Sequence, residues 1–343
     1  SSQAAGLFAT ANGATIKNFT IQNAVVKNMT TLSTSGTAVV LGSSQFGATI
    51  SGVNVKNAVV ESNRLVAGIV GYFNGTVENC SVDGIELTAT PDDLDGNGIY
   101  DNGDKVGGII ANHNSHVSSL TQNNIVNNFK IRAYRDMGGI IGGGRGSFTN
   151  NKAMNGEIIV DQLVAPYFEA PKNANAGEIV GKNLAATIDN TDNFENVTII
   201  TLTAQNYVTS QASFEAALSA GDKIYLGKNT ASRAVTADYV WKPASKSFEI
   251  IAVEDGVVID MNNATQKVLC ANASVAASFE GVTLNYTNVD YAGFHHSVSE
   301  TYKNCHTNGV ACTYAPKATF EEGPSTKQGT PKITGRKGPP QKK

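Results

Sequence analysis

The chain has 343 residues, of which 16% are charged, and its formal net charge of −3 argues against nucleic acid as the partner of the whole molecule. Four cysteines are too few to frame a disulfide scaffold, and the 34 glycines follow no Gly-X-Y period, which excludes collagen. No run of 18 apolar residues is present, so we predict no membrane-spanning segment. The abundance of Gly, Asn, Thr and Val, all middling or poor helix formers, favours a β-rich fold.

Six similar blocks, in which small residues flank apolar ones, recur roughly every 30–40 residues in the first part of the chain. The blocks are Ala5–Ala9, Ala38–Gly42, Ala67–Gly71, Gly107–Ala111, Gly138–Gly142 and Gly177–Gly181. A second apolar position follows each block, and then a stretch such as 53–60 or 80–87 that alternates apolar and polar residues. Each repeat therefore predicts two or three short strands of about three to five residues, with Gly and Asn at the corners.

The physical interpretation of these repeats is a parallel β-solenoid, an all-β fold of the right-handed β-helix kind. A single coil cannot shield its apolar side, whereas stacked coils share one continuous core. Asn suits the corners because it tolerates a positive φ and can hydrogen-bond the neighbouring backbone. A β-sandwich with accidental similarity between its strands is the alternative, and it would not be expected to repeat one block six times.

The blocks resemble the GLUG-type repeat of bacterial surface proteins, which is named for its Gly-Leu-hydrophobic-Gly core. The resemblance covers residues 1–203, although Leu7-Phe8-Ala9 and Val40-Leu41-Gly42 depart from the motif. It implies an exported, adhesin-like protein of a bacterium, often one of the Bacteroidetes. We therefore expect an extracellular or cell-surface location, with the export signal outside this chain, which opens at Ser1 without a leader.

A second unit is predicted over 206–322. Residues 210–221 indicate a short helix with a Ser cap, Phe214 and Leu218 one turn apart, and a terminating Gly. Strands are predicted at 223–226, 248–252, 256–260 and 267–270, and Phe279, Tyr302 and Phe320 begin successive rungs. The helix followed by a strand resembles the N-terminal cap of pectate-lyase-like right-handed β-helices. Residues 323–343 are proline-rich and carry six basic residues and no acid, which predicts a disordered basic tail.

The sharpest local motif is the run 93–104, which matches the spacing of a twelve-residue calcium loop. Oxygen-bearing residues stand at the ligand positions, Gly98 permits the sharp turn, and Asp104 replaces the usual final Glu. We predict a structural Ca²⁺ site of extracellular-repeat type; a solvated acidic insertion is the alternative. The predicted ligands are Asp93, Asp95, Asn97, Ile99 through its carbonyl, Asp101 and Asp104.

Other candidate sites carry weaker signals. His113 and His116 form an HxxH pair without an evident third ligand, which favours a polar turn over a zinc site. Arg132, Tyr134 and Asp136 would share one face of a strand and could in principle bind a sugar, but a charged exterior strand is the simpler interpretation. The four cysteines are expected to be small buried hydrophobes, with a disulfide between residues 305 and 312 as the alternative.

Together these features predict a non-catalytic, adhesin-like protein that binds polysaccharide, host glycan or matrix, and that is a monomer. The alternative function is a polysaccharide lyase or glycoside hydrolase of the β-helix class. That activity requires carboxylates, often with Arg, to converge on one face of the sheet, and the only sequence candidates besides 132–136 are Asp189 and Asp192.

Overall fold

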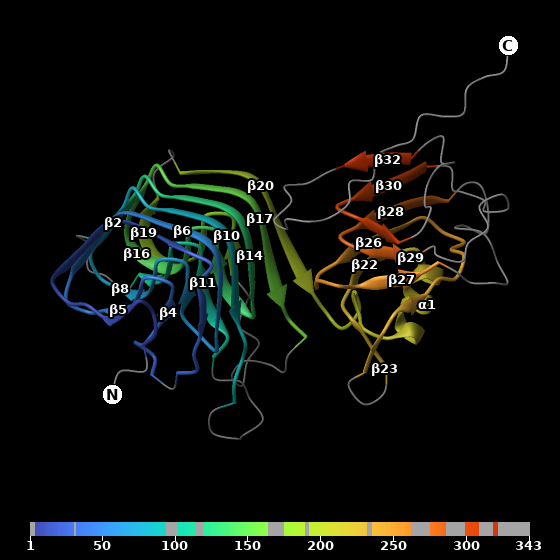
Figure 1. Ribbon diagram of the computed structural model, residues 1–343, viewed down its shortest axis with the longest axis horizontal. Helices are drawn as coiled ribbons and strands as arrows, with labels where there is room; N and C mark the ends of the chain where they lie inside the picture. Colours follow the sequence, from blue (N-terminus) through green and yellow to red (C-terminus); the bar gives the residue numbers. More distant parts are fainter. Residues whose placement is uncertain are drawn as a thin grey trace, which may run out of the picture. The chain divides into compact units, whose positions relative to one another are not determined.

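The computed structural model describes residues 4–30, 32–93, 102–113, 119–163, 175–188, 192–231, 235–261, 275–285, 299–308 and 318–321. This part of the chain is nearly all β-structure, with one helix, and its strands pair in parallel except for one short antiparallel pair (Figure 1). The chain divides into two compact units, Ser1–Leu202 (unit 1) and Thr203–Lys343 (unit 2), each of which is described by itself. The expected all-β parallel solenoid is confirmed.

Unit 1 consists of coils whose equivalent strands stack in parallel rows. Strands that enter the repeat blocks form a five-stranded sheet of β4 (Thr37–Ala38), β7 (Val66–Ala67), β11 (Asp104–Gly107), β15 (Arg135–Gly138) and β18 (Ala176–Gly177). Strands that leave the blocks are β1 (Phe8–Thr10), β5 (Leu41–Ser44), β8 (Val70–Phe73), β12 (Ile110–His113), β16 (Ile141–Thr149) and β19 (Val180–Ile188). The remaining strands of the coils are β2 (Ala14–Gln22), β3 (Val25–Lys27), β6 (Ala48–Ser62), β9 (Thr76–Glu78), β10 (Ser81–Ala89), β13 (Leu120–Gln122), β14 (Ile125–Ala133), β17 (Lys152–Asp161) and β20 (Asn193–Leu202).

The apolar residues of the blocks lie directly on one another from coil to coil. The backbone N–H of Ile69 donates to the carbonyl of Ile109 at 3.2 Å, Ile109 donates to Ile140 at 2.9 Å, and Ile140 donates to Ile179 at 3.0 Å. The first three of these side chains are fully buried in the core, and Ile179 packs against it. The predicted stacking of the blocks is therefore confirmed, because the same position of each repeat occupies the same place in successive coils.

The small residues of the blocks are required by close approach of backbone to backbone. A Cβ atom on Gly108 would lie 2.2 Å from the carbonyl oxygen of Gly139 in the next coil, and one on Gly139 would lie 2.2 Å from the carbonyl oxygen of Glu178. Both distances are far below any real contact of a Cβ atom, so a larger residue would force the coils apart. Glu178 itself stands in the last block of the unit, where the described residues place no further coil against it.

Left-handed residues turn the corners, as the Asn content predicts. One corner row consists of six residues with φ between 50° and 71°, namely Asn23, Asn57, Gly84, Asn128, Asn155 and Asn196. These residues interrupt the side-chain alternation without ending the parallel ladder. As a result β6 runs for 15 residues, and the expectation of strands of three to five residues is wrong for the long strands.

Unit 2 stacks its coils in two parallel sheets. One contains β21 (Tyr207–Val208), β22 (Lys223–Leu226), β26 (Phe248–Ala252), β28 (Ala276–Glu280), β30 (Ser299–Lys303) and β32 (Ala318–Glu321). The other contains β25 (Tyr239–Val240), β27 (Val258–Asp260), β29 (Thr283–Asn285) and β31 (His306–Asn308), and β23 (Asn229–Ala231) pairs with β24 (Val235–Ala237). Phe279, Tyr302 and Phe320 are direct register partners, as predicted. The predicted strand at 267–270 and the tail 323–343 lie outside the described residues.

The predicted helix is α1 (Gln211–Ala220), which begins after the N-cap Ser210 and ends at Gly221 with φ 78°. Its buried residues Phe214 and Leu218 join the core of unit 2, where the ring of Phe214 lies 4.9 Å from that of Tyr239. The side-chain amide of Gln211 also makes two hydrogen bonds with the backbone of Val240, donating to its carbonyl and accepting from its N–H, each at 2.9 Å. The Gln211 side chain thereby pairs with the backbone N–H and carbonyl groups of Val240 at the edge of β25, as a neighbouring strand would.

Candidate functional site

The run 93–104 lies in the sequence between β10 and β11, and the described residues at its two ends are held by hydrogen bonds. The side-chain oxygen of Asn102 accepts from the backbone N–H of Asp92 at 2.7 Å, and Gly103 donates its N–H to the carbonyl of Asn63 at 2.7 Å. The two ends of the run are therefore brought together before the coil continues. Of the predicted ligands, Asp93 and Asp104 are described, whereas Asp95, Asn97, Ile99 and Asp101 lie outside the described residues.

Asp104 is buried at the start of β11, with 1% of its surface exposed. Its Oδ2 atom lies 3.2 Å from the Nζ atom of Lys105 and 3.3 Å from an Nη atom of Arg135, its register partner in the next coil. Its Oδ1 atom is buried and has no hydrogen-bond partner among the described residues. Asp104 can thus offer one oxygen to a cation, but it does not fit the two-oxygen role of the last residue of a calcium loop because its other oxygen is held by two cationic groups.

The next coil holds a second buried carboxylate, that of Asp136, one residue after the register partner of Asp104. Its Oδ1 atom accepts a hydrogen bond of 2.7 Å from Asn175, and its Oδ2 atom lies 4.0 Å from the Nζ atom of Lys182. Asp104, Lys105, Arg135, Asp136 and Lys182 together form a group that we call the charge cluster. Each buried carboxylate in it faces a cation from its own or the following coil, so the cluster joins adjacent coils through ion pairs.

Sequence reasoning identified Asp104 but missed its partner Arg135. The signal was available, because Asp104 and Arg135 stand at the same distance before the blocks Gly107–Ala111 and Gly138–Gly142. Equivalent positions of neighbouring repeats are neighbours in space, so opposite charges there predict an ion pair.

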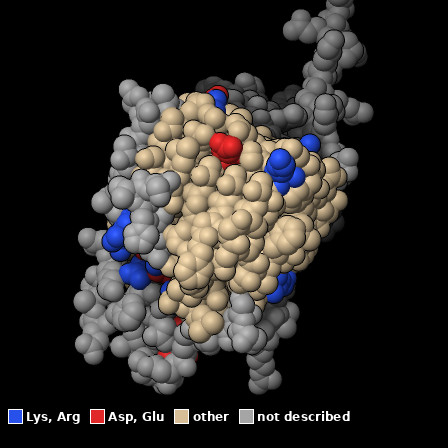
Figure 2. Space-filling model, turned by 90° about the vertical axis from the view of Figure 1, so that its left-hand side faces the viewer, with Lys and Arg blue, Asp and Glu red and all other residues tan. Residues whose placement is uncertain are grey.

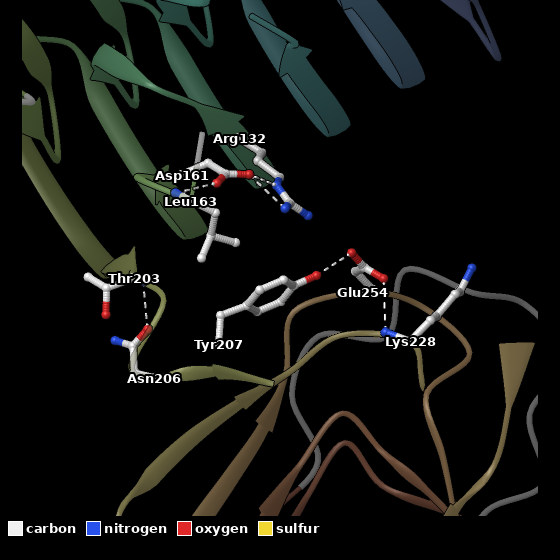
Figure 3. A network of polar contacts seen from close by, with 8 residues as sticks. All are labelled: Arg132, Asp161, Leu163, Thr203, Asn206, Tyr207, Lys228 and Glu254. Atoms are coloured by element: carbon white, nitrogen blue, oxygen red, sulfur yellow. Dashed lines mark hydrogen bonds and ion pairs between the residues drawn. The ribbon is translucent and has the colours of Figure 1, made fainter. Parts of the chain in front are cut away.

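The candidate sugar-binding face at 132–136 is not assembled. The chain turns at Tyr134, between β14 and β15, so Arg132 and Asp136 do not share one strand face. The favoured interpretation, a charged exterior strand, is also wrong, because Tyr134, Arg135 and Asp136 are buried. Arg132 instead binds the Oδ2 atom of Asp161 through Nε at 2.9 Å and Nη2 at 2.7 Å (Figure 3). The figure also shows Asp161 accepting a hydrogen bond from the backbone of Leu163 through its other oxygen, so both oxygens of this carboxylate are engaged within the protein.

Asp192, the other catalytic candidate within the described residues, belongs to a buried row of amides. Its Oδ1 atom accepts from the backbone N–H of Asn151 at 2.7 Å and from the Asn151 side chain at 2.9 Å. Asn151 in turn accepts from the side chain of Asn124 at 2.9 Å, and Asn124 accepts from the backbone of Cys80 at 3.0 Å. This carboxylate therefore ends an internal hydrogen-bonded row, and Asp189 lies outside the described residues.

His113 is part of the core, so the expected polar turn is wrong for this residue. Its ring lies between those of Phe73 and Phe148, with centroids 5.9 and 5.8 Å away, and its Nδ1 atom lies 2.7 Å from the carbonyl oxygen of Arg145. Burial lowers the pKa of His113 from 6.5 to about 4, so the ring is neutral at physiological pH and donates its Nδ1 proton to that carbonyl. His116 lies outside the described residues.

Cys80 and Cys305 are buried free thiols, as expected for small core residues. Their Sγ atoms each lie 3.3 Å from a backbone carbonyl oxygen, that of Glu78 and that of Phe279 respectively. Burial raises the pKa of both thiols to about 11. Neither thiol therefore has the thiolate character of a catalytic cysteine. Residues 270 and 312 lie outside the described part of the chain.

Within the described residues, no three His, Cys, Asp or Glu side chains are placed to hold a metal ion, and no helix is long and apolar enough to cross a membrane. No protein-family model, curated protein or solved structure matches the chain.

Proposed function

We propose that the protein is a non-catalytic, adhesin-like solenoid of a bacterial surface that binds glycans. The observation that carries this proposal is a row of side-chain amides along one corner of unit 1, formed by Asn127, Asn128, Asn155 and Asn196, which we call the amide ridge. Asn127 and Asn128 donate to Asp83 of the preceding coil at 2.9 and 2.8 Å. Asn155 donates to Asn127 at 2.9 Å and Asn196 donates to Asn155 at 3.1 Å, so each amide is oriented by a neighbouring coil.

The amide ridge has the chemistry that sugar hydroxyls require. Each amide has more donor and acceptor capacity than the row uses, although the Oδ1 atom of Asn128 is buried. Successive coils repeat the amides at about 4.8 Å along the solenoid. Asn155 is partly exposed and Asn196 is exposed. Because the side chains are already ordered, binding a polysaccharide along the ridge costs little further side-chain entropy.

The charged residues of the described coils support binding without catalysis. Outer-face charges pair between neighbouring coils, as in Lys130 with Glu157 at 3.2 Å and Lys152 with Glu195 at 3.0 Å. The carboxylates of Asp161 and Asp192 are likewise engaged by the protein itself. No observation in the described residues favours the lyase or hydrolase alternative.

A glycan array with the purified protein, followed by product analysis of each bound glycan, tests this function. The change Asn155→Gly removes one amide of the ridge but keeps the left-handed corner, because Gly84 occupies the same corner in another coil. We expect the variant to lose retention by roughly tenfold, while Asn150→Gly, at a different corner, does not. Equal retention by all three proteins contradicts the assignment of the ridge, and new chain ends in the glycan contradict a non-catalytic role.

We further propose that the run 93–104 binds a structural Ca²⁺, with Asp93, Asp95, Asn97, Asp101 and the Ile99 carbonyl as ligands and Asp104 contributing one oxygen. Its support is the loop spacing and the buried, unbonded Oδ1 atom of Asp104. We expect a higher melting temperature in calcium than in chelator, and a smaller difference for Asp95→Asn. Identical melting curves for the wild-type protein contradict the site.

A further inference from the structure

Phe46 exposes its aromatic ring at a corner of unit 1. Within the described residues it is the most exposed large apolar side chain, at 75%. It lies between β5 and β6 in the second coil, where β6 pairs with β2 of the first coil and with β9 of the third. The exposure therefore does not result from an end of the stack. Because single exposed apolar residues are common, a site is indicated only if the surroundings of the ring are suited to binding.

The turn that carries Phe46 is held from both neighbouring coils. The side-chain oxygen of Asn12 accepts from the backbone N–H groups of Gln45 at 3.0 Å and of Phe46 at 3.3 Å. Gly13 donates its N–H to the carbonyl of Phe46 at 3.1 Å. From the third coil, the side chain of Asn74 donates to the carbonyl of Gln45 at 2.7 Å. The ring is therefore presented by a backbone that is already fixed, and a ligand does not have to order this turn when it binds.

A row of threonine hydroxyls begins directly beyond the turn. Thr49, three residues after Phe46, is the register partner of Thr15 in the first coil and of Thr76 in the third. The residue after each threonine is buried in the core, so the threonines face outward; Thr15 is exposed and the other two are partly exposed. Each hydroxyl can donate and accept, and the three repeat at about 4.8 Å along the solenoid. An apolar ring and a regular row of polar groups are therefore neighbours on this part of the surface.

Few charges surround the ring and the threonines. Between residues 4 and 50 the only ionic side chains are those of Lys17 and Lys27, and Lys27 pairs with Glu61 at 2.7 Å. Glu78, at the end of β9, accepts a hydrogen bond from Gln122 at 2.8 Å. Figure 2 shows the side on which β2 and β5 lie in Figure 1, and uncharged residues cover most of the described surface there. A neutral ligand therefore fits this part of the surface better than a polyanion or a polycation.

We propose that Phe46 and the threonine row form a second glycan contact, which takes a neutral pyranose unit of a polysaccharide. The apolar C–H face of the sugar packs on the ring, and the sugar hydroxyls exchange hydrogen bonds with the threonines and with the exposed amide of Asn12. A protein partner matches the surface less well, because hot spots of protein interfaces lie in apolar surroundings that exclude water. The contact depends on the glycan binding proposed above, and it adds a ligand class and a position distinct from the amide ridge.

Affinity electrophoresis in gels that contain a soluble polysaccharide tests this contact. The neutral probes are β-glucan, galactan and galactomannan, and polygalacturonate is the charged comparison. We expect at least one neutral probe to retard the wild-type protein, Phe46→Ala to weaken the affinity roughly tenfold, and Phe46→Trp, which keeps an aromatic face, to retain it. Val25→Ala is the control, because Val25 is 66% exposed on β3, which pairs with the far end of β6. Circular dichroism checks that all variants are folded.

Phe46→Trp also gives a direct signal from the corner. The chain has one native tryptophan, Trp241, which is buried in the core of unit 2. A change in emission on adding the retained glycan therefore reports on the introduced ring. We expect a blue shift, because the sugar displaces water from the indole, and no shift in the wild-type protein. An unchanged emission of the variant at saturating glycan contradicts stacking at residue 46.

The outcomes separate this contact from the glycan binding proposed above. If Phe46→Ala is retarded as strongly as the wild-type protein while Asn155→Gly is not, the contact at Phe46 is wrong and the amide ridge stands. Retention by polygalacturonate alone contradicts a neutral ligand. Equal losses for Phe46→Ala and Val25→Ala contradict a specific role of the ring. If no polysaccharide retards the wild-type protein, both the contact and the proposed function fail.

Discussion

The two units turn their chain with the same backbone device but differ in what fills the inside of the corner. In unit 1 the left-handed residues Asn123 and Asn150 are followed by the buried amides Asn124 and Asn151, whereas the same corner of the two preceding coils holds the buried Val53 and Cys80. In unit 2 the left-handed residues Gly256, Gly281 and Asn304 are all followed by buried residues without an amide, namely Val257, Val282 and Cys305. One kind of corner thus accepts an apolar filling in both units and a polar one in the later coils of unit 1.

The cores differ in the same way. Unit 1 stacks aliphatic residues, mainly Val and Ile, over Gly-lined contacts between coils. Unit 2 stacks aromatic rings, with Trp241 5.4 Å from Phe248 and 5.7 Å from Phe279, and Phe279 parallel to Tyr302 at 5.5 Å. The comparison teaches that unit 1 depends on hydrogen bonds and close backbone approach, whereas unit 2 depends on the volume of its side chains.

The largest effect should come from the glycine contacts of unit 1. Gly108→Ala places a Cβ atom 2.2 Å from the carbonyl oxygen of Gly139, so we expect it to lower the free energy of unfolding by more than about 3 kcal/mol. Gly143→Ala is the control, because its nearest neighbour would be a Lys105 side-chain atom at 3.7 Å. Denaturant unfolding measures both, and equal stability of the two variants would show that the coils can separate freely.

The buried amides Asn124 and Asn151 should not be replaceable by the apolar residues that fill the equivalent corner of unit 2. Asn151→Val introduces the residue type found at 282, but it leaves the Thr121 carbonyl and the Asn124 amide without their bonds of 2.9 Å to Asn151. We expect a loss of about 3 kcal/mol by thermal unfolding. The neighbouring change Asn150→Gly keeps the left-handed corner and should cost less than about 1 kcal/mol; a larger loss there than at Asn151 would contradict the importance of the buried row.

His113 should make unit 1 sensitive to acid. Its pKa is near 6.5 when unfolded and about 4 when folded, so between these values the unfolded state binds the proton that the folded state excludes. The contribution of neutral His113 to the free energy of unfolding is complete above pH 6.5, and it falls by about 3 kcal/mol as the pH drops to 4. We expect His113→Phe to flatten this part of the profile of unfolding free energy against pH, and parallel profiles for variant and wild type would rule the effect out.

The smallest effect concerns the cap of unit 2. Gln211→Ala removes both hydrogen bonds to Val240 and should lower the stability by about 1 kcal/mol. Gln211→Glu keeps the acceptor but loses the donor, so an intermediate value is expected. If Gln211→Ala is neutral in denaturant unfolding, the side chain does not protect the edge of β25.

Most of the fold could be predicted from the sequence repeats and from local motifs such as the helix caps. The blocks predicted the stacked isoleucines because one repeat position has one environment, and the Ser cap, Phe214 and Gly221 placed α1 within a residue. The errors arose where spatial context overrides the local pattern. The HxxH motif gives no hint that His113 completes a ring stack with Phe73 and Phe148, and strand alternation cannot reveal the turn at Tyr134.

Each coil lies directly on the next in the stated register, and engineered disulfides test this stacking most directly. Lys130 is the register partner of Glu86 on one side and of Glu157 on the other. Cysteines at 130 and 157 should stand about 4.8 Å apart and cross-link, whereas cysteines at 86 and 157 lie two coils apart, about 9.6 Å, which is beyond disulfide reach. Peptide mass spectrometry should find the first bond and not the second; the reverse result, or equal yields of both, would contradict the stacked coils.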